Sequence, residues 1–95
     1  MAAAADEISA EVTIVNRRGL HARASAKFAA VAGSFDASVR VVKDGITVGA
    51  GSIMGLMMLG AGAGATIRIT ATGAQAKEAI ETLAGLIADR FGEGE

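Results

Sequence analysis

Short stretches in which apolar and polar residues alternate constrain the fold of this chain more than any other feature. Residues 8–15 are the clearest case, because apolar side chains at positions 10, 12 and 14 alternate with polar ones at 11 and 13. A period of two predicts strands that bury one face and leave the other in water. The same pattern predicts strands over residues 37–42, 46–48 and 66–70.

Two longer segments have the apolar spacing of amphipathic helices. The first begins at His21 or Ala22 and ends at Gly33, a residue suited to the left-handed position after a helix. The second follows Gly73 and runs to about Phe91. A third, short helix is predicted over residues 53–59. The buried stripes of the two longer helices are Ala24, Phe28, Val31 and Ala32 in the first, and Ala76, Ile80, Leu83, Ile87 and Phe91 in the second.

The predicted elements follow the order β-α-β-β-α-β-α. Asp44 and Gly45 separate the second and third strands, and this pair is typical of a two-residue hairpin. With one apolar face per strand, helices would cover one side of an antiparallel sheet and leave the other side wet. We therefore expect one α+β domain over residues 8–91, a flexible N-terminal tail over residues 1–7 and a C-terminal tail over residues 92–95.

Composition argues against several classes of protein. The 95 residues carry nine basic and ten acidic side chains, so the net charge of −1 does not favour a nucleic-acid partner. The absence of cysteine excludes disulfides and thiolate metal sites, and one histidine disfavours a His-rich metal site. Neither a secretory signal nor an apolar stretch of membrane-spanning length is recognisable. We expect a cytoplasmic protein without a metal or cofactor.

His21 is the single histidine and precedes the first predicted helix, two residues before Arg23. The free N–H groups of a first helical turn favour anions, and arginine adds a permanent charge with forked donors. A neutral imidazole in this place is a nucleophile that could carry a phosphoryl group. The alternative is an exposed histidine that has no role or that only caps the helix.

The glycine-rich segment at residues 60–65 does not indicate a nucleotide site. It leads into a strand rather than a helix, and the chain has no Gly-Lys-Ser or Gly-Lys-Thr sequence. Any phosphoryl group on His21 would therefore be delivered by another protein.

The short helix after Ser52 holds more apolar side chains than one helix can bury. Leu56 and Leu59 can face the core together, which would leave Ile53, Met54 and Met57 facing the solvent. Adaptable methionines are common at surfaces that bind several partners, so we expect a docking face. An entirely internal helix is the alternative.

Two motifs at matching separation resemble those of a known family. Gly-Leu-His-Ala-Arg at residues 19–23 is similar to the active-site signature of HPr, the histidine-containing phosphocarriers of the bacterial phosphoenolpyruvate-dependent phosphotransferase system (PTS). Ser-Ile-Met-Gly-Leu at residues 52–56 is similar to the regulatory-serine motif of that family. The resemblance covers residues 8–91 and implies an HPr-like open-faced β-sandwich, in which three helices cover one face of a four-stranded antiparallel sheet.

The resemblance also implies a function and partners. His21 would be phosphorylated at Nδ1 by Enzyme I and would pass the group to an EIIA-type acceptor. The chain would then be a monomeric carrier rather than an enzyme. Arg23 would match the active-site arginine, and Ser52 the serine that an HPr kinase/phosphorylase modifies in some bacteria. The apolar docking surface would consist of Leu20, Ile53, Met54 and Met57. The backbone N–H groups expected to hold the phosphoryl group are those of Ala22, Arg23 and Ala24.

The chain departs from the family pattern at two positions. Ala24 stands where proline is common, which adds a free N–H near His21, and Gly51 stands where a lysine is common before the serine. Two other functions stay open: a regulatory relative that acts mainly by binding partners, as in a nitrogen-related branch of the system, and a ligand-binding module of a larger enzyme. An independent enzyme is the least favoured, because no acid–base motif accompanies the histidine.

Overall fold

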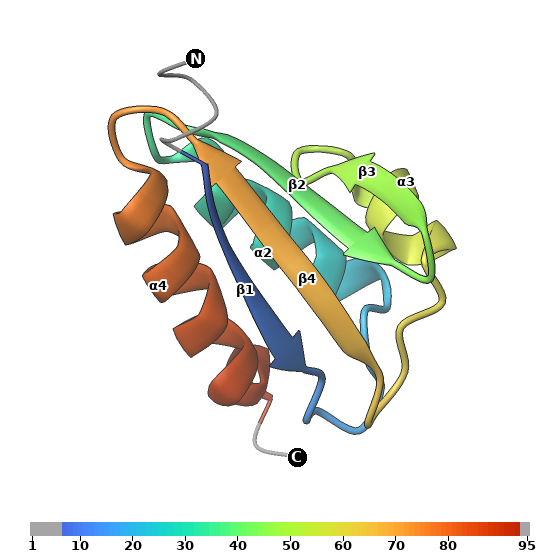
Figure 1. Ribbon diagram of the computed structural model, residues 1–95. Helices are drawn as coiled ribbons and strands as arrows, with labels where there is room; N and C mark the ends of the chain where they lie inside the picture. Colours follow the sequence, from blue (N-terminus) through green and yellow to red (C-terminus); the bar gives the residue numbers. More distant parts are fainter. Residues whose placement is uncertain (1–6, 94–95) are drawn as a thin grey trace.

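A computed structural model describes residues 7–93, so residues 1–6 of the predicted N-terminal tail and 94–95 of the C-terminal tail lie outside it. The strands are β1 (Ile8–Thr13), β2 (Ser38–Lys43), β3 (Ile46–Gly49) and β4 (Thr66–Thr72). The helices are α2 (Ala22–Gly33), α3 (Ile53–Met58) and α4 (Ala76–Ala88). The strands form one antiparallel sheet in the order β1-β4-β2-β3. Figure 1 shows the helices gathered on one side of this sheet, which confirms the predicted fold class.

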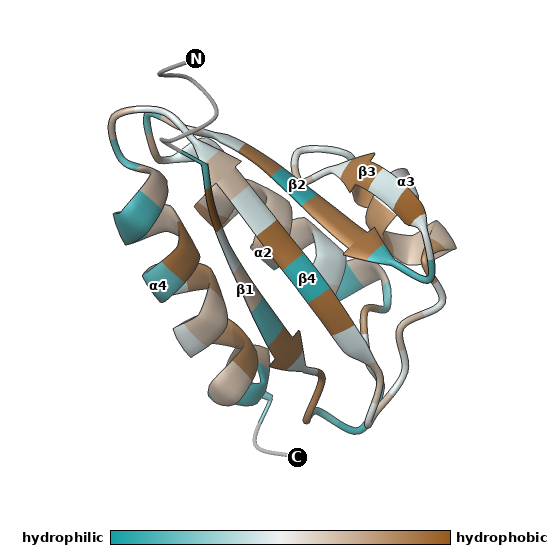
Figure 2. Ribbon diagram, viewed as in Figure 1, coloured by the Kyte–Doolittle hydropathy of each residue, from teal (hydrophilic) through white to brown (hydrophobic). Residues whose placement is uncertain are grey.

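The sheet has the predicted covered and wet faces. Along β4, Ile67 and Ile69 are buried, whereas Arg68 between them is exposed. Arg68 lies opposite Glu11 of β1 and donates to its carboxylate at 3.2 Å. Figure 2 shows the resulting alternation of hydrophilic and hydrophobic bands along β4. A period of two in the sequence thus became one buried and one solvated face.

The hairpin between β2 and β3 turns at the predicted pair. Asp44 and Gly45 have φ angles of 52° and 82°, as a two-residue hairpin turn requires. The core lies between the sheet and the helices, where Phe28 of α2, Leu56 of α3 and Leu83 of α4 are fully buried.

The end of α4 differs from the expectation that this helix continues to about Phe91. The helix ends at Ala88, and Arg90, Phe91 and Gly92 have φ angles of 56°, 55° and 75°. These three residues form a separate short turn, η1 (Arg90–Gly92), and Phe91 is buried from this turn with 1% exposure rather than from a continuous helical stripe. The apolar spacing was compatible with a helix, but packing of the ring decided the backbone.

Candidate functional site

The loop between β1 and α2 is organised by Asn16, whose side chain is fully buried. Its Nδ2 donates to the carbonyl oxygen of Gly19 at 2.9 Å, and the Leu20 N–H donates to the Ala61 oxygen at 2.9 Å. Gly19 has a φ of +66° and approaches the backbone at Ala61 closely. The loop therefore delivers His21 to the start of α2 in a defined position.

His21 is the N-cap residue of α2, which begins at Ala22, within the predicted range for the helix start. Its backbone is extended, and its Nδ1 accepts the Arg23 N–H at 3.2 Å. The His21 carbonyl oxygen accepts the Ser25 N–H at 2.8 Å, which begins the helical hydrogen bonding. The Nδ1 lone pair thus faces the first-turn amides, where the positive end of the helix dipole favours an anion.

The other ring nitrogen of His21 contacts an acidic side chain from the C-terminal end of the described chain. Nε2 lies 2.6 Å from Oε2 of Glu93, and Oε1 of Glu93 accepts from Asn16 Nδ2 at 3.2 Å. The two paired side chains are 17% and 15% exposed. Because an ionised carboxylate can only accept, we assign the proton of the neutral ring to Nε2 and the lone pair to Nδ1.

The pKa of the Glu93 carboxyl is lowered from its ordinary value. The hydrogen bond with His21 is the largest cause, partial desolvation opposes it, and the Asn16 hydrogen bond and the charge of Arg18 add to the lowering. A carboxyl whose pKa falls on folding stabilises the protein above its ordinary pKa. This contribution disappears as the pH falls through the lowered pKa.

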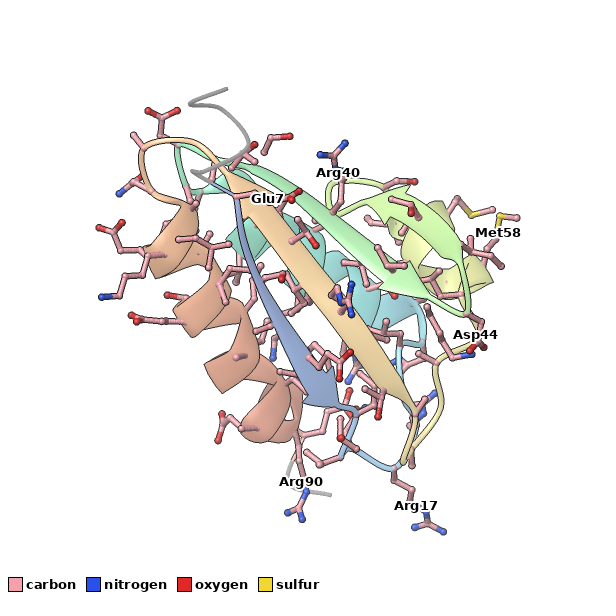
Figure 3. The ribbon with its side chains drawn as sticks, viewed as in Figure 1. Glu7, Arg17, Arg40, Asp44, Met58 and Arg90 are labelled. Carbon is pink, nitrogen blue, oxygen red and sulfur yellow. The ribbon has the colours of Figure 1, made fainter. Side chains whose placement is uncertain are left out.

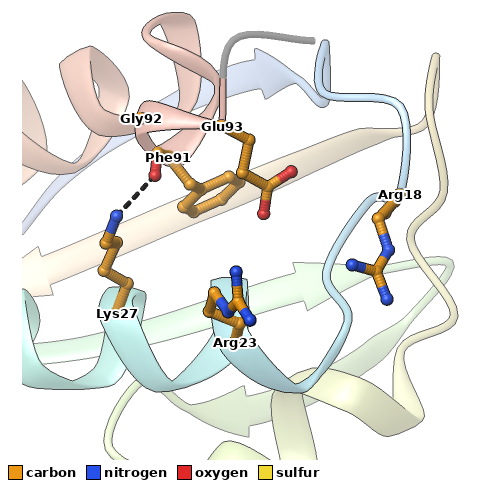
Figure 4. A pocket seen from close by; sticks show the side chains of 6 residues that line it. All are labelled: Arg18, Arg23, Lys27, Phe91, Gly92 and Glu93. Atoms are coloured by element: carbon orange, nitrogen blue, oxygen red, sulfur yellow. Dashed lines mark hydrogen bonds between the residues drawn. The ribbon is translucent and has the colours of Figure 1, made fainter.

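Three basic side chains share an open pocket with Glu93. Arg18 comes from the loop before His21, and Arg23 and Lys27 project from successive turns of α2 (Figure 4). Lys27 Nζ also donates to the Phe91 carbonyl oxygen at 2.6 Å. Three cations against one carboxylate leave an excess of positive charge beside His21, which suits a phosphoryl group.

The three residues whose backbone N–H groups were predicted to hold the phosphoryl group differ in exposure. Ala22 and Arg23 are exposed at the start of α2, whereas Ala24 is fully buried. The Ala24 N–H is therefore covered in this structure, although the alanine does provide the additional N–H that a proline would lack.

Ser52 and α3 lie as the sequence predicted. The Ser52 side chain caps α3 by accepting the Gly55 N–H at 2.9 Å. Leu56 and Leu59 are buried, with 0% and 5% exposure. The apolar side chains that face the solvent are Ile53 (41% exposed), Met54 (69%), Met57 (39%) and Met58 (77%). Figure 3 shows Met58 projecting away from α3.

Leu20, which was predicted to belong to the docking surface, is largely buried. Its exposure is only 5%, because it packs in the core between α2 and the segment after α3. Its small exposed part nevertheless lines a shallow pocket together with His21 and Met57, so its place in the docking surface stays a prediction. Met58, which the sequence interpretation had not selected, is the most exposed apolar side chain of α3. A shallow pocket lined by His21, Met57 and Arg18 joins this face to the histidine.

Sequence reasoning also missed Asn16, Arg18, Lys27 and Glu93 at the site. Lys27 had a usable signal, since it follows Arg23 by four residues and so lies on the same side of α2. Arg18 was placed only in a loop, and Glu93 was assigned to a tail. Nothing local to Glu93 indicates a contact with a histidine 72 residues earlier.

Comparison with known proteins agrees with this geometry. The family described as "PTS HPr component phosphorylation site" matches residues 8–89. The chain is 51% identical to Phosphocarrier protein HPr of Cupriavidus necator over 85 residues, which are 90% of this chain and 96% of that protein. It is 38% identical to Phosphocarrier protein NPr of Shewanella violacea over 87 residues, covering 92% of this chain and 96% of that protein.

The fold is likewise similar to solved structures of this family. The crystal structure of HPr-C-His from Thermoanaerobacter tengcongensis superimposes with a TM-score of 0.87 at 41% sequence identity, over 90% of this chain and 97% of that one. Within residues 7–93, no helix has the length and apolar character needed to cross a membrane. The chain therefore belongs to the HPr family of PTS phosphocarrier proteins, which carry phosphoryl groups and are not enzymes.

Proposed function

We propose that this phosphocarrier accepts a phosphoryl group on His21 Nδ1 from phosphorylated Enzyme I and passes it to an EIIA-type acceptor. The observation that carries the proposal is the position of Nδ1, which faces the first turn of α2 and lies 3.2 Å from the Arg23 N–H. When phosphorus bonds to Nδ1, this N–H can donate to a phosphoryl oxygen instead, together with the Ala22 N–H. The Ala24 N–H would join them only after its cover is displaced.

The charge around His21 suits a carrier. Arg18 and Arg23 offset the negative charge of the group in transit, and the pocket is open, so a partner can align donor and acceptor. The exposed apolar face of α3 lies beside His21, and we propose Ile53, Met54 and Met57 as its docking residues. We place this exchange between a monomeric carrier and its partners in the cytoplasm.

The test uses Enzyme I and labelled phosphoenolpyruvate. We expect acid-labile label on the wild-type protein and none on His21→Asn. Asparagine is a good N-cap residue, so this variant retains the start of α2 but lacks the nucleophilic nitrogen. Circular dichroism and thermal unfolding establish that the variant is folded. Label that persists on folded His21→Asn would refute His21 as the site.

We propose further that phosphorylation of Ser52 weakens docking without unfolding α3. A phosphate at a helix N-terminus is compatible with the helix dipole, but it would add about −1.5 to −2 charges next to Ile53 and Met54. A partner that approaches this apolar face with an acidic rim would then be repelled. An HPr kinase/phosphorylase is the partner that this switch requires.

Ser52→Asp is expected to accept phosphate from Enzyme I about tenfold more slowly, which corresponds to ~1.4 kcal/mol. Ser52→Asn is the matched control, because asparagine also caps helices and has nearly the same shape as aspartate but no charge. We expect the control to react like the wild-type protein and both variants to unfold like it. Equal rates for Ser52→Asp and Ser52→Asn would contradict the switch.

A second candidate function follows from the similarity to Phosphocarrier protein NPr of Shewanella violacea. In this alternative the protein acts mainly by binding partners in a nitrogen-related regulatory branch rather than in sugar uptake. Incubation of the phosphorylated protein with one EIIA-type acceptor from each branch distinguishes the two. Label that passes to the sugar-branch acceptor supports the carrier in sugar uptake, whereas label that this acceptor does not take supports the alternative.

A further inference from the structure

The C-terminal turn is built in a way that holds Glu93 at His21. Arg90 and Phe91 adopt left-handed backbone angles that cost side-chain-bearing residues energy, and such angles persist where the surroundings enforce them. The enforcing contacts are the buried Phe91 ring and the Lys27 hydrogen bond to the Phe91 carbonyl oxygen. Backbone bonds from Gly92 to Asp89 and from Glu93 to Arg90 close the turn at 3.0 and 2.9 Å.

The carboxylate itself is held from two sides. One oxygen contacts His21 Nε2 at 2.6 Å and the other accepts from Asn16 at 3.2 Å. Asn16 is fully buried and also binds the Gly19 carbonyl, so the loop that positions His21 and the turn that positions Glu93 share one side chain. The Glu93 carboxylate is thus directed at the ring nitrogen opposite the proposed nucleophile.

We propose that Glu93 is a positioning residue for phosphoryl transfer, which orients the His21 ring through Nε2–H and offsets the positive charge that the ring gains on phosphorylation. The inference rests on the proposed function. Glu93 and His21 would form a carboxylate–imidazole pair, in which the carboxylate stabilises an imidazolium without taking its proton. Glu93 acts through the ring and does not touch the phosphoryl group.

The transfer step balances without a further reactant. The donor N–P bond breaks and its electron pair stays on the donor nitrogen of phosphorylated Enzyme I. The Nδ1 lone pair of His21 forms the new bond to phosphorus, and the proton on Nε2 stays in place. The ring changes from neutral to cationic, and Glu93 lies against it as that charge develops. Discharge to the acceptor reverses these changes, so the same carboxylate assists transfer in both directions.

Two variants separate the two parts of this role. Glu93→Gln keeps an oxygen that can accept from Nε2–H but removes the charge, whereas Glu93→Ala removes both. Glu81→Gln is the matched control, because Glu81 is exposed on α4 and its substitution changes the net charge equally. Thermal unfolding is measured for all three, so that any loss of rate is compared among folded proteins.

The first readout does not depend on phosphorylation. In proton NMR spectra of the wild-type protein with a neutral His21 ring, we expect a strongly downfield Nε2–H resonance that is protected from solvent exchange. The resonance should move upfield in Glu93→Gln, disappear in Glu93→Ala and remain unchanged in Glu81→Gln. A wild-type protein without this resonance would show that the contact does not form in solution, and would overturn the inference.

The second readout is the rate of label transfer from Enzyme I. We expect Glu93→Gln and Glu93→Ala to accept phosphate about tenfold more slowly than Glu81→Gln and the wild-type protein. A wild-type rate in Glu93→Gln would overturn the charge-compensating role while leaving the proposed function intact. A wild-type protein that takes no label would instead refute the proposed function, and the role of Glu93 in transfer with it, even if the NMR resonance is present.

Discussion

Alanine at position 19 is expected to lower the free energy of unfolding by about 3 kcal/mol, and the unfolding midpoint by about 12–24 °C. A Cβ at this position would lie 2.4 Å from the Ala61 carbonyl oxygen and 2.7 Å from the Gly62 Cα. Both are backbone atoms and cannot rotate away. The φ of +66° adds the cost of a left-handed residue, about 1–2 kcal/mol.

The substitution should also impair the site. The Gly19 carbonyl oxygen accepts a hydrogen bond from Asn16 Nδ2, and the neighbouring Leu20 N–H donates to the Ala61 carbonyl oxygen. A displaced loop would break these bonds and move His21 away from Glu93. We therefore expect slower phosphoryl acceptance at temperatures where Gly19→Ala is still folded.

Urea and thermal unfolding followed by circular dichroism test this prediction. Gly62→Ala is the control, because a Cβ there meets no heavy atom within 4 Å, and we expect a change within about 0.5 kcal/mol. Equal stability of the two alanine variants would show that Gly19 does not approach the backbone of Ala61 and Gly62 as closely as the structure describes.

Removing the Phe91 ring is expected to have the second large effect, a loss of about 3 kcal/mol of stability. The ring is 1% exposed and fills the space at the end of α4, so Phe91→Ala leaves a cavity that nearby chain cannot fully close. The turn would lose the packing that offsets the energetic cost of its left-handed backbone angles. Glu93 would then no longer be held at His21.

Unfolding experiments measure the stability, and the downfield Nε2–H resonance of His21 reports the position of Glu93. Arg90→Ala is the control, since Arg90 lies in the same turn with a φ of 56° but its side chain is exposed (Figure 3). We expect the control to keep both the stability and the resonance. Should Phe91→Ala keep the resonance, the buried ring is not what holds the turn.

Local patterns in the sequence were sufficient for most of the fold. The alternation in β4, the Asp44-Gly45 turn and the short helix after Ser52 all depend on neighbouring residues, and all are found where expected. The position of His21 at the start of α2 was equally readable, because helix starts have local preferences. The outward direction of Met54 was also predictable, because the short helix has more apolar side chains than it can bury and Leu56 and Leu59 already take its buried face.

The sequence by itself therefore determined the order of elements, the covered face of the sheet and a histidine at the start of a helix. Only the tertiary structure decided that Leu20 is buried, that α4 ends before a left-handed turn at Phe91, and that Glu93 contacts the histidine. The physical reason is the range of the forces involved. Periodicity, caps and hairpins arise within a few residues. The three other outcomes depend on contacts between segments that are far apart in the sequence, as between Leu20 and Ala61 or between His21 and Glu93.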